Sequence, residues 1–320
     1  MMNLDDKLAP VCLFTYNRLA ETKKTIEALK NNFLATETDV FIFSDAAKNN
    51  SVMNSVSEVR SYIKSVTGFK SVKIIERDTN YGLAKSIITG VSQVINEFGK
   101  VIVLEDDLLT SQNFLNFMND SLKQYEKNKN VWSVSGFCLE VESKGGKVND
   151  HDAFFWGRSH SWGWATWQDR WVSVDWNIGD WSEFKRDREK ISKFNQYGSD
   201  LFNMLKKSML GKINSWYIRF TYNQFKQNKL TVYPFTSKVI NIGFMDSATH
   251  CDTYNRNKVI FDSTLKKEFN LPTEFVIDQN IRKQLYKYKS LTHRATGKIL
   301  TLSMKLGLIK QRTQEGDKWV

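Results

Sequence analysis

Three acidic residues stand side by side in the stretch VIVLEDDLLT, residues 101–110. Glu105, Asp106 and Asp107 follow four apolar residues typical of a strand that is buried on both faces. Adjacent carboxylates repel one another and resist removal from water, and no basic residue stands beside these three. A divalent cation would offset that cost, because Mg²⁺ and Mn²⁺ take oxygen ligands and complete their shells with substrate phosphates. The triplet therefore predicts a site for a metal ion and a phosphate-bearing ligand.

The elements that must position this triplet recur with a spacing of about 30 residues, the length of a βαβ unit. Helical patterns with one apolar face separate the strands, for example Val52, Val56, Val59, Ile63 and Val66. Alternating strands and helices predict an α/β fold, a mostly parallel sheet flanked by helices on both faces. The expected strands are 11–14, 40–43, 72–75, 101–104, 131–136 and 230–234, and the expected helices lie around 19–33, 52–66, 83–98, 111–126, 183–210 and 215–228.

Polar residues follow each of the first strands. In an open parallel sheet, ligands bind beyond the carboxyl ends of the strands, so these residues should converge with the acidic triplet. Helix capping is the alternative interpretation for Asp45 and Asn80, but it accounts poorly for three acids in a row. The strand-end residues are Thr15, Asn17 and Arg18 after the first strand, Asp45 after the second, and Asn80 and Gly82 after the third.

Two common phosphate-binding devices are missing from the sequence. The first turn, FTYNRLAE, contains no glycine, so it cannot form the Gly-rich cradle of a dinucleotide site, and there is no P-loop. A nucleotide would therefore need a metal ion to neutralise its phosphates.

Seven of the ten tryptophans lie between residues 156 and 181. Tryptophan suits sugar binding, because the C–H face of a pyranose packs on the indole plane. We favour a core position for Trp171, Trp176 and Trp181. For Trp162 and Trp164 we favour a site role, because Gly163 between them permits close backbone approach.

The formal charge of +11 would attract nucleic acid, anionic lipid or phosphate-bearing substrates. Residues 296–320 combine apolar and basic residues, so a helix there could lie on an anionic membrane or pack on the domain. The three cysteines are widely spaced, residues 1–10 lack an apolar leader, and no run of about 18 apolar residues occurs. We therefore expect a cytoplasmic protein, with a peripheral position at the inner face of a membrane left open.

The segments FTYNR, FSD, NYGLAKSIITGV and VLEDDL occur in this order and at the spacing of a nucleotide-sugar glycosyltransferase of the GT-A fold. The chain resembles glycosyltransferase family 2 and the N-acetylglucosaminyltransferase I type, which carries a Glu-Asp-Asp form of the acidic motif. The resemblance covers residues 9–137 well and later residues less closely. It implies a bacterial enzyme that acts in surface-polysaccharide synthesis.

The resemblance also implies roles for individual residues. Arg18 would approach the nucleotide, Asp45 would bind the uracil or ribose, Asp106 would contact the ribose or sugar, and Asp107 would bind Mn²⁺ or Mg²⁺. His250, a late histidine beside hydroxyl residues, would complete the metal shell. The donor site would also include Thr15, Asn17, Asn80, Gly82, Lys85 and Glu105, and the Trp162-Gly163-Trp164 segment would help to form the acceptor pocket.

The catalytic base is the least defined role. Inversion, inferred by analogy, needs a carboxylate that takes the proton of the acceptor hydroxyl. Relatives often carry an acid where Tyr217 stands here. The remaining candidates are Asp169, the first choice, with Asp175 and Asp180.

We accordingly expect a metal-dependent glycosyltransferase with a UDP-linked donor and a glycan or lipid-linked acceptor. Residues 1–140 would bind the nucleotide sugar, 141–260 the acceptor, and 261–320 would form a basic helical extension. A nucleotidyltransferase is the second hypothesis, although it needs a glycine-rich phosphate loop. A nucleic-acid-binding protein ranks below both, because acids at the focus of the sheet would repel phosphate backbones.

Overall fold

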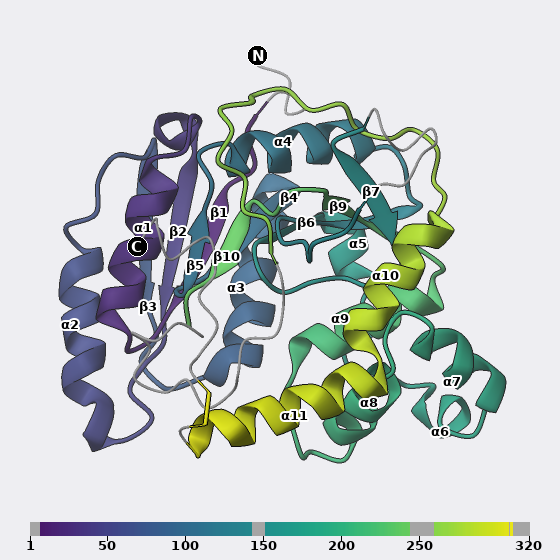
Figure 1. The fold of residues 1–320 in the computed structure, drawn as a ribbon. Helices are drawn as coiled ribbons and strands as arrows, with labels where there is room; N and C mark the ends of the chain where they lie inside the picture. The colour runs from purple at the N-terminus through teal and green to yellow at the C-terminus, as the bar shows by residue number, and fades with distance from the viewer. Residues whose placement is uncertain (1–6, 143–150, 244–258, 307, 310–320) are drawn as a thin grey trace.

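The structure is a computed structural model that describes residues 7–142, 151–243, 259–306 and 308–309. An eight-stranded sheet in the order β3-β2-β1-β4-β8-β6-β9-β7 runs through the molecule (Figure 1). The strands are β1 (Val11–Thr15), β2 (Asp39–Ser44), β3 (Ser71–Glu76), β4 (Lys100–Glu105), β6 (Val131–Ser135), β7 (Ala153–Trp156), β8 (Trp164–Trp167) and β9 (Leu230–Pro234). A separate pair consists of β5 (Leu108–Thr110) and β10 (Val239–Asn241).

Most strands of the large sheet run in one direction. β1 pairs in parallel with β2 and β4, β2 with β3, and β6 with β9, while β8 runs antiparallel between β4 and β6. β7 is antiparallel to β9 at the edge. The mostly parallel α/β sheet predicted from the sequence is therefore confirmed.

Helices cover both faces of this sheet. One apolar layer packs β1 and β4 against α1 and α4, and a second packs β1, β2 and β4 against α3 and α9. The helices are α1 (Leu19–Lys30), α2 (Met53–Ile63), α3 (Gly82–Phe98), α4 (Phe114–Tyr125), α5 (Gln168–Val172), α6 (Trp181–Phe184), α7 (Arg188–Asn195), α8 (Leu201–Met209), α9 (Trp216–Lys226), α10 (Gln279–Lys289) and α11 (Leu291–Lys305), with short 3-10 turns at Ala35–Glu37 and Asn50–Val52.

The helix expected over 183–210 is broken into α6, α7 and α8. Gly198 has a φ of +153° between α7 and α8. A Cβ at this position would lie 2.2 Å from Nη1 of Arg158 and 2.7 Å from Oδ1 of Asp200. The chain therefore needs a glycine where it turns over this ion pair.

The aromatic segment forms two strands that the sequence pattern did not indicate. β7 and β8 each hold four buried residues, with no alternation of apolar and polar positions. Both strands lie within the sheet that begins in the first third of the chain. The sheet thus draws strands from both sides of residue 140, and the division at that residue remains a prediction about function.

Candidate active site

The parallel strands bring the polar strand-end residues to one cavity of about 410 Å³. Its wall includes Glu105 and Asp106 at the end of β4. Of the residues predicted from the other strand ends, the cavity also contains Thr15, Asn17, Arg18, Asp45, Asn80 and Gly82. This convergence is what a parallel sheet provides, because its carboxyl ends lie on one edge.

Arg18 meets the acidic triplet from across the cavity. Its guanidinium forms ion pairs with Asp106 and, at 3.0 Å, with Oδ2 of Asp107. The backbone of Arg18 begins α1, so the first turn of that helix aims the side chain at the acids. The local sequence shows no base beside the triplet, but the fold supplies one from 88 residues away. Arg18 thus contacts the acids in this structure, whereas the resemblance placed it near the nucleotide.

The turn that carries Asp106 and Asp107 is fixed through its backbone. The hydroxyl of Thr25 donates to the carbonyl of Asp106 at 2.9 Å and accepts from the amide of Leu108 at 3.1 Å. The amide of Ile242 donates to the carbonyl of Asp107 at 2.8 Å. These bonds fix the backbone of the turn and thereby the positions of the two carboxylates.

The carboxylates carry more negative charge than Arg18 can neutralise. Burial, and then the charges of Asp107 and Asp106, raise the pKa of Glu105 to about 8. Burial also raises the pKa of Asp106 to about 6, against the opposing effect of Arg18. The site is therefore poised to accept further positive charge.

The donor atoms suit a hard divalent cation, since carboxylate oxygens from one or two residues are the usual protein share of a magnesium shell. Asp106 and Asp107 would hold such an ion. Within the described ranges, no group of three or more His, Cys, Asp or Glu side chains has the arrangement of a metal site. His250, the expected further ligand, lies outside the described residues.

We predict that Glu105→Gln changes the pH dependence of stability. An acid whose folded-state pKa is raised stabilises the fold most below its unfolded pKa, and this contribution is lost as the pH rises to about 8. In the metal-free protein, Glu105→Gln should therefore unfold at a higher denaturant concentration than wild type at pH 8, with a smaller difference at pH 5. If the variant and wild type differed by the same amount at pH 5 and pH 8, the raised pKa of Glu105 would be contradicted.

Asp45 acts mainly as an anchor in this structure. It accepts hydrogen bonds from the amides of Tyr81 at 2.8 Å and Gly82 at 2.9 Å, and from Nδ2 of Asn80 at 3.1 Å. These bonds fix the loop where α3 begins, and Gly82 has a φ of +68° there. This is the capping role that was the alternative interpretation, so contact with a nucleobase or ribose remains a prediction.

Five further residues that were not selected from the sequence line the cavity. Ser86 occupies the small-residue position of the Asn-x-Gly-x-x-x-Ser pattern, which was a usable signal. Lys48 is exposed and gives the cavity a second cation beside Arg18. Phe14, Tyr16 and Leu83 complete the set. Lys85, in contrast, does not line the cavity; its Nζ lies 4.1 Å from the centre of the Tyr81 ring.

Trp164 is not an acceptor-site residue, and this prediction is wrong. It is 1% exposed and stacks on Trp216 at a ring-centre distance of 4.9 Å. Gly163 has a φ of +57°, and a Cβ there would lie 2.6 Å from Val239, so this glycine serves close packing. Trp162 is half-buried, with its ring 4.6 Å from that of Phe137, and does not line the cavity. Trp171 is buried in the core, as expected.

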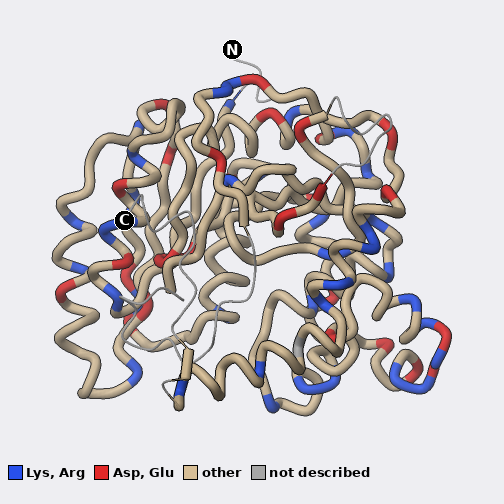
Figure 2. The backbone as a smooth tube through the Cα atoms, in the orientation of Figure 1, with Lys and Arg blue, Asp and Glu red and all other residues tan. Residues whose placement is uncertain are grey.

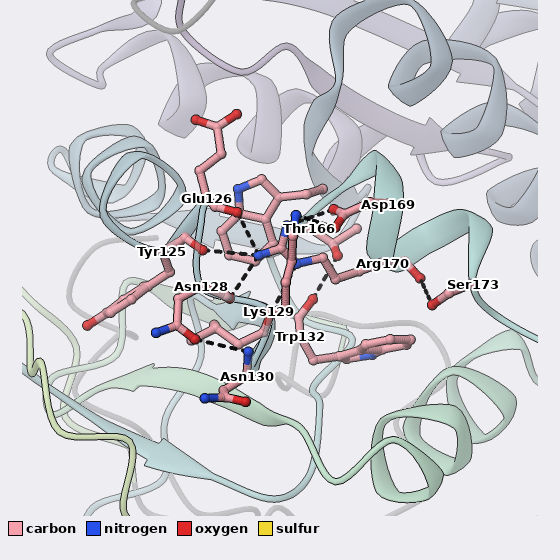
Figure 3. A network of polar contacts seen from close by, with 12 residues as sticks. Tyr125, Glu126, Asn128, Lys129, Asn130, Trp132, Thr166, Asp169, Arg170 and Ser173 are labelled. Atoms are coloured by element: carbon pink, nitrogen blue, oxygen red, sulfur yellow. Dashed lines mark hydrogen bonds and ion pairs between the residues drawn. The ribbon is translucent and has the colours of Figure 1, made fainter.

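The three candidate bases are also in the wrong place. β8 runs antiparallel to β4 and pairs Trp167 with Lys100, so Asp169 lies at the end of the sheet opposite Glu105. Burial raises the pKa of Asp169, but hydrogen bonds from Lys129 and Arg170 hold it below its usual range. Figure 3 shows Asp169 within a network around Arg170.

Asp175 and Asp180 have structural roles as well. Asp175 accepts amide hydrogen bonds from Asn177 at 3.0 Å and Gly179 at 2.7 Å, which closes a turn. Asp180 accepts from the hydroxyl of Tyr222 at 3.0 Å. None of the three acids lines the cavity. Tyr217, at the position where relatives carry an acid, accepts a hydrogen bond from Nε of Arg158 at 2.7 Å.

A larger cavity of about 550 Å³ lies between α1, β5 and residues 261–265. Its one buried carboxylate, Asp262, is already paired with Lys238. Size alone therefore does not identify the site, and the clustered acids favour the smaller cavity.

Comparison with known proteins agrees with a site in the smaller cavity. Residues 11–138 match the family model of glycosyl transferase family 2. These residues contain the acidic triplet and all the strand-end residues of the cavity, and the match supports a glycosyltransferase. A search of the curated proteins found no match.

Several solved structures share weak similarity. S. aureus TarS is 17% identical, with a TM-score of 0.31 over 43% of this chain and 23% of its own. The mannosyltransferase PcManGT from Pyrobaculum calidifontis, in complex with GDP-Man and Mn²⁺, is 11% identical, with a TM-score of 0.32 over 52% of this chain and 46% of its own. UDP-glucose pyrophosphorylase complexed with UDP-glucose is 11% identical, with a TM-score of 0.35 over 71% of this chain and 90% of its own.

Proposed function

We propose that the protein is a glycosyltransferase that transfers a sugar from a nucleotide-sugar donor to a hydroxyl of a glycan or lipid-linked oligosaccharide. The observation that carries the proposal is the cavity at the carboxyl ends of β1, β2 and β4, which is lined by Glu105, Asp106, Arg18 and Lys48. Asp107 does not line it but forms an ion pair with Arg18. The match of residues 11–138 to glycosyl transferase family 2 supports the same class.

Different residues of the cavity would bind different parts of the donor. Asp106 and Asp107 would hold Mn²⁺ or Mg²⁺, which supplies charge stabilisation to the departing diphosphate when bound. Arg18 and Lys48 would bind phosphate oxygens, Arg18 by turning from the acids once a cation takes its place. Thr15, Asn17 and Ser86 offer hydroxyl and amide groups to the nucleoside or sugar.

Finer features of the reaction are part of the proposal. A UDP-linked donor, inversion at the anomeric carbon and a role in surface-polysaccharide synthesis are inferred from the motif resemblance. The likeness to the N-acetylglucosaminyltransferase I type rests on the Glu-Asp-Asp triplet. A cytoplasmic location is proposed because three widely spaced cysteines, an odd number, suit a reducing compartment. Separately, none of the helices in the described parts of the chain could span a membrane.

A thermal-shift screen of nucleotides and nucleotide sugars, with and without Mn²⁺, tests the proposal. A ligand at one hundred times its dissociation constant stabilises the native state by about 2.7 kcal/mol. We expect the melting temperature to rise only when a nucleotide or nucleotide sugar and Mn²⁺ are both present. If single-stranded nucleic acid raised it instead, without Mn²⁺, the transferase hypothesis would be wrong.

A further inference from the structure

The outward face of α11 is apolar, the reverse of what a surface helix of a soluble protein normally presents. Leu291, Ile299, Leu302 and Leu306 are 59–69% exposed. At 3.6 residues per turn they form one stripe about 80° wide. The opposite side of the helix faces the protein, where Gly297 is buried and Leu300 and Met304 are partly covered.

Basic residues accompany this stripe, and acidic residues are absent. The sequence of residues 279–305 contains seven lysines and arginines and no aspartate or glutamate (Figure 2). On the wheel of α11, Lys298 and Lys305 flank the apolar stripe on one side, and both are exposed. A long lysine side chain in this position can lie along an apolar surface while its ammonium group reaches anionic headgroups.

We propose that α11 lies in the surface of an anionic phospholipid membrane and docks the protein there. The apolar stripe would enter the boundary between headgroups and acyl chains, and the flanking lysines would bind the headgroups. In Figure 1, α11 runs along the bottom of the molecule, the side toward which β1 descends. On the proposed function, this attachment would turn the donor cavity toward lipid-linked acceptors.

Charge argues against the other occupants of this face. If a second copy of the chain paired its α11 symmetrically, the basic residues of both copies would meet without an acid from either α10 or α11 to offset them. A nucleic acid would meet aliphatic side chains along the stripe, where aromatic rings are needed for base stacking.

The test is binding of the full chain to vesicles, without any nucleotide sugar. We compare phosphatidylcholine vesicles with vesicles that contain about 30% phosphatidylglycerol, a fraction high enough to give a strongly negative surface. Sedimentation should recover the protein with the anionic vesicles, and added salt should weaken the binding. Equal binding to neutral vesicles, or none to either, would overturn the proposal.

Two substitution pairs locate the contact on α11. Leu302→Ser combined with Leu306→Ser should lower vesicle binding at least roughly tenfold, because two exposed leucines no longer enter the membrane. The matched control is Leu210→Ser combined with Leu265→Ser, two leucines that are 56% and 67% exposed elsewhere. Lys298→Gln should weaken binding roughly fivefold, and Lys185→Gln, which replaces an exposed lysine just after α6, should leave it unchanged.

If a variant and its control lost vesicle binding equally, the assignment of the contact to α11 would be wrong. The assignment would also be wrong if an α11 variant changed the protein from a dimer to a monomer but still bound vesicles as well as wild type. Because these measurements need no donor, they can succeed or fail independently of the thermal-shift screen.

Discussion

Asp107→Ala should reduce metal-dependent turnover of the donor by at least about a hundredfold, the cost typical of losing one charge-stabilising group in an active site. Asp107 is the acid that would bind the cation most directly, and its carboxylate forms an ion pair with Arg18. Its loss leaves Arg18 paired with Asp106, so the fold should persist. The measurement is release of nucleoside diphosphate from the matching nucleotide sugar at a fixed Mn²⁺ concentration.

Asp169→Asn is the matched control for that experiment. It removes a carboxylate that is 47% exposed and lies at the other end of β4. We expect turnover within about twofold of wild type, since surface ion pairs contribute little to stability and this one does not reach the cavity. If Asp169→Asn were as inactive as Asp107→Ala, the cavity at the end of β4 would not be the active site.

Arg170→Met should cause the largest loss of stability. The Arg170 side chain is buried, and its guanidinium donates to the carbonyls of Val131 at 3.2 Å, Glu126 at 2.8 Å and Asn128 at 2.9 Å. Figure 3 shows the Arg170 side chain reaching Glu126 and Asn128, in the turn before β6. Methionine would leave those acceptors without partners, which should lower the free energy of unfolding by about 3–5 kcal/mol.

Arg170→Lys separates charge from geometry in the same place. Lysine keeps the positive charge but lacks the planar fork that serves several carbonyls at once, so its stability should fall between those of wild type and the methionine variant. Chemical denaturation of the three proteins gives the comparison. A loss below about 1 kcal/mol for Arg170→Met would mean that water replaces the guanidinium and that the network contributes little.

The regular spacing of apolar runs was sufficient to predict the strands of the first third and the edge of the sheet where they end. Strand polarity then predicted which residues would share a cavity, and Glu105, Asp106 and Arg18 do so. These predictions succeeded because each rests on local pattern and one rule of parallel sheets.

The predictions that failed depend on contacts between distant parts of the chain. Asp169 follows a tryptophan-rich segment closely in sequence, but the reversed direction of β8 carries it away from the cavity. No local pattern shows that reversal, because β8 is buried on both faces. The pairing of Arg18 with the acids is likewise a contact between residues far apart in sequence, which the residues next to the triplet do not indicate.

The pairing of β5 with β10 also bears on when the site can assemble. β5 begins directly after Asp107, and its partner is residues 239–241, so Leu108 meets Asn241. A ribosome-bound chain that has emerged only through α4 already holds every residue of the acidic turn, yet lacks the strand that supports it. Contacts between such remote segments form late because closing a long loop costs entropy. On the proposed function, metal affinity should therefore appear during synthesis only after the second half of the chain has emerged and docked.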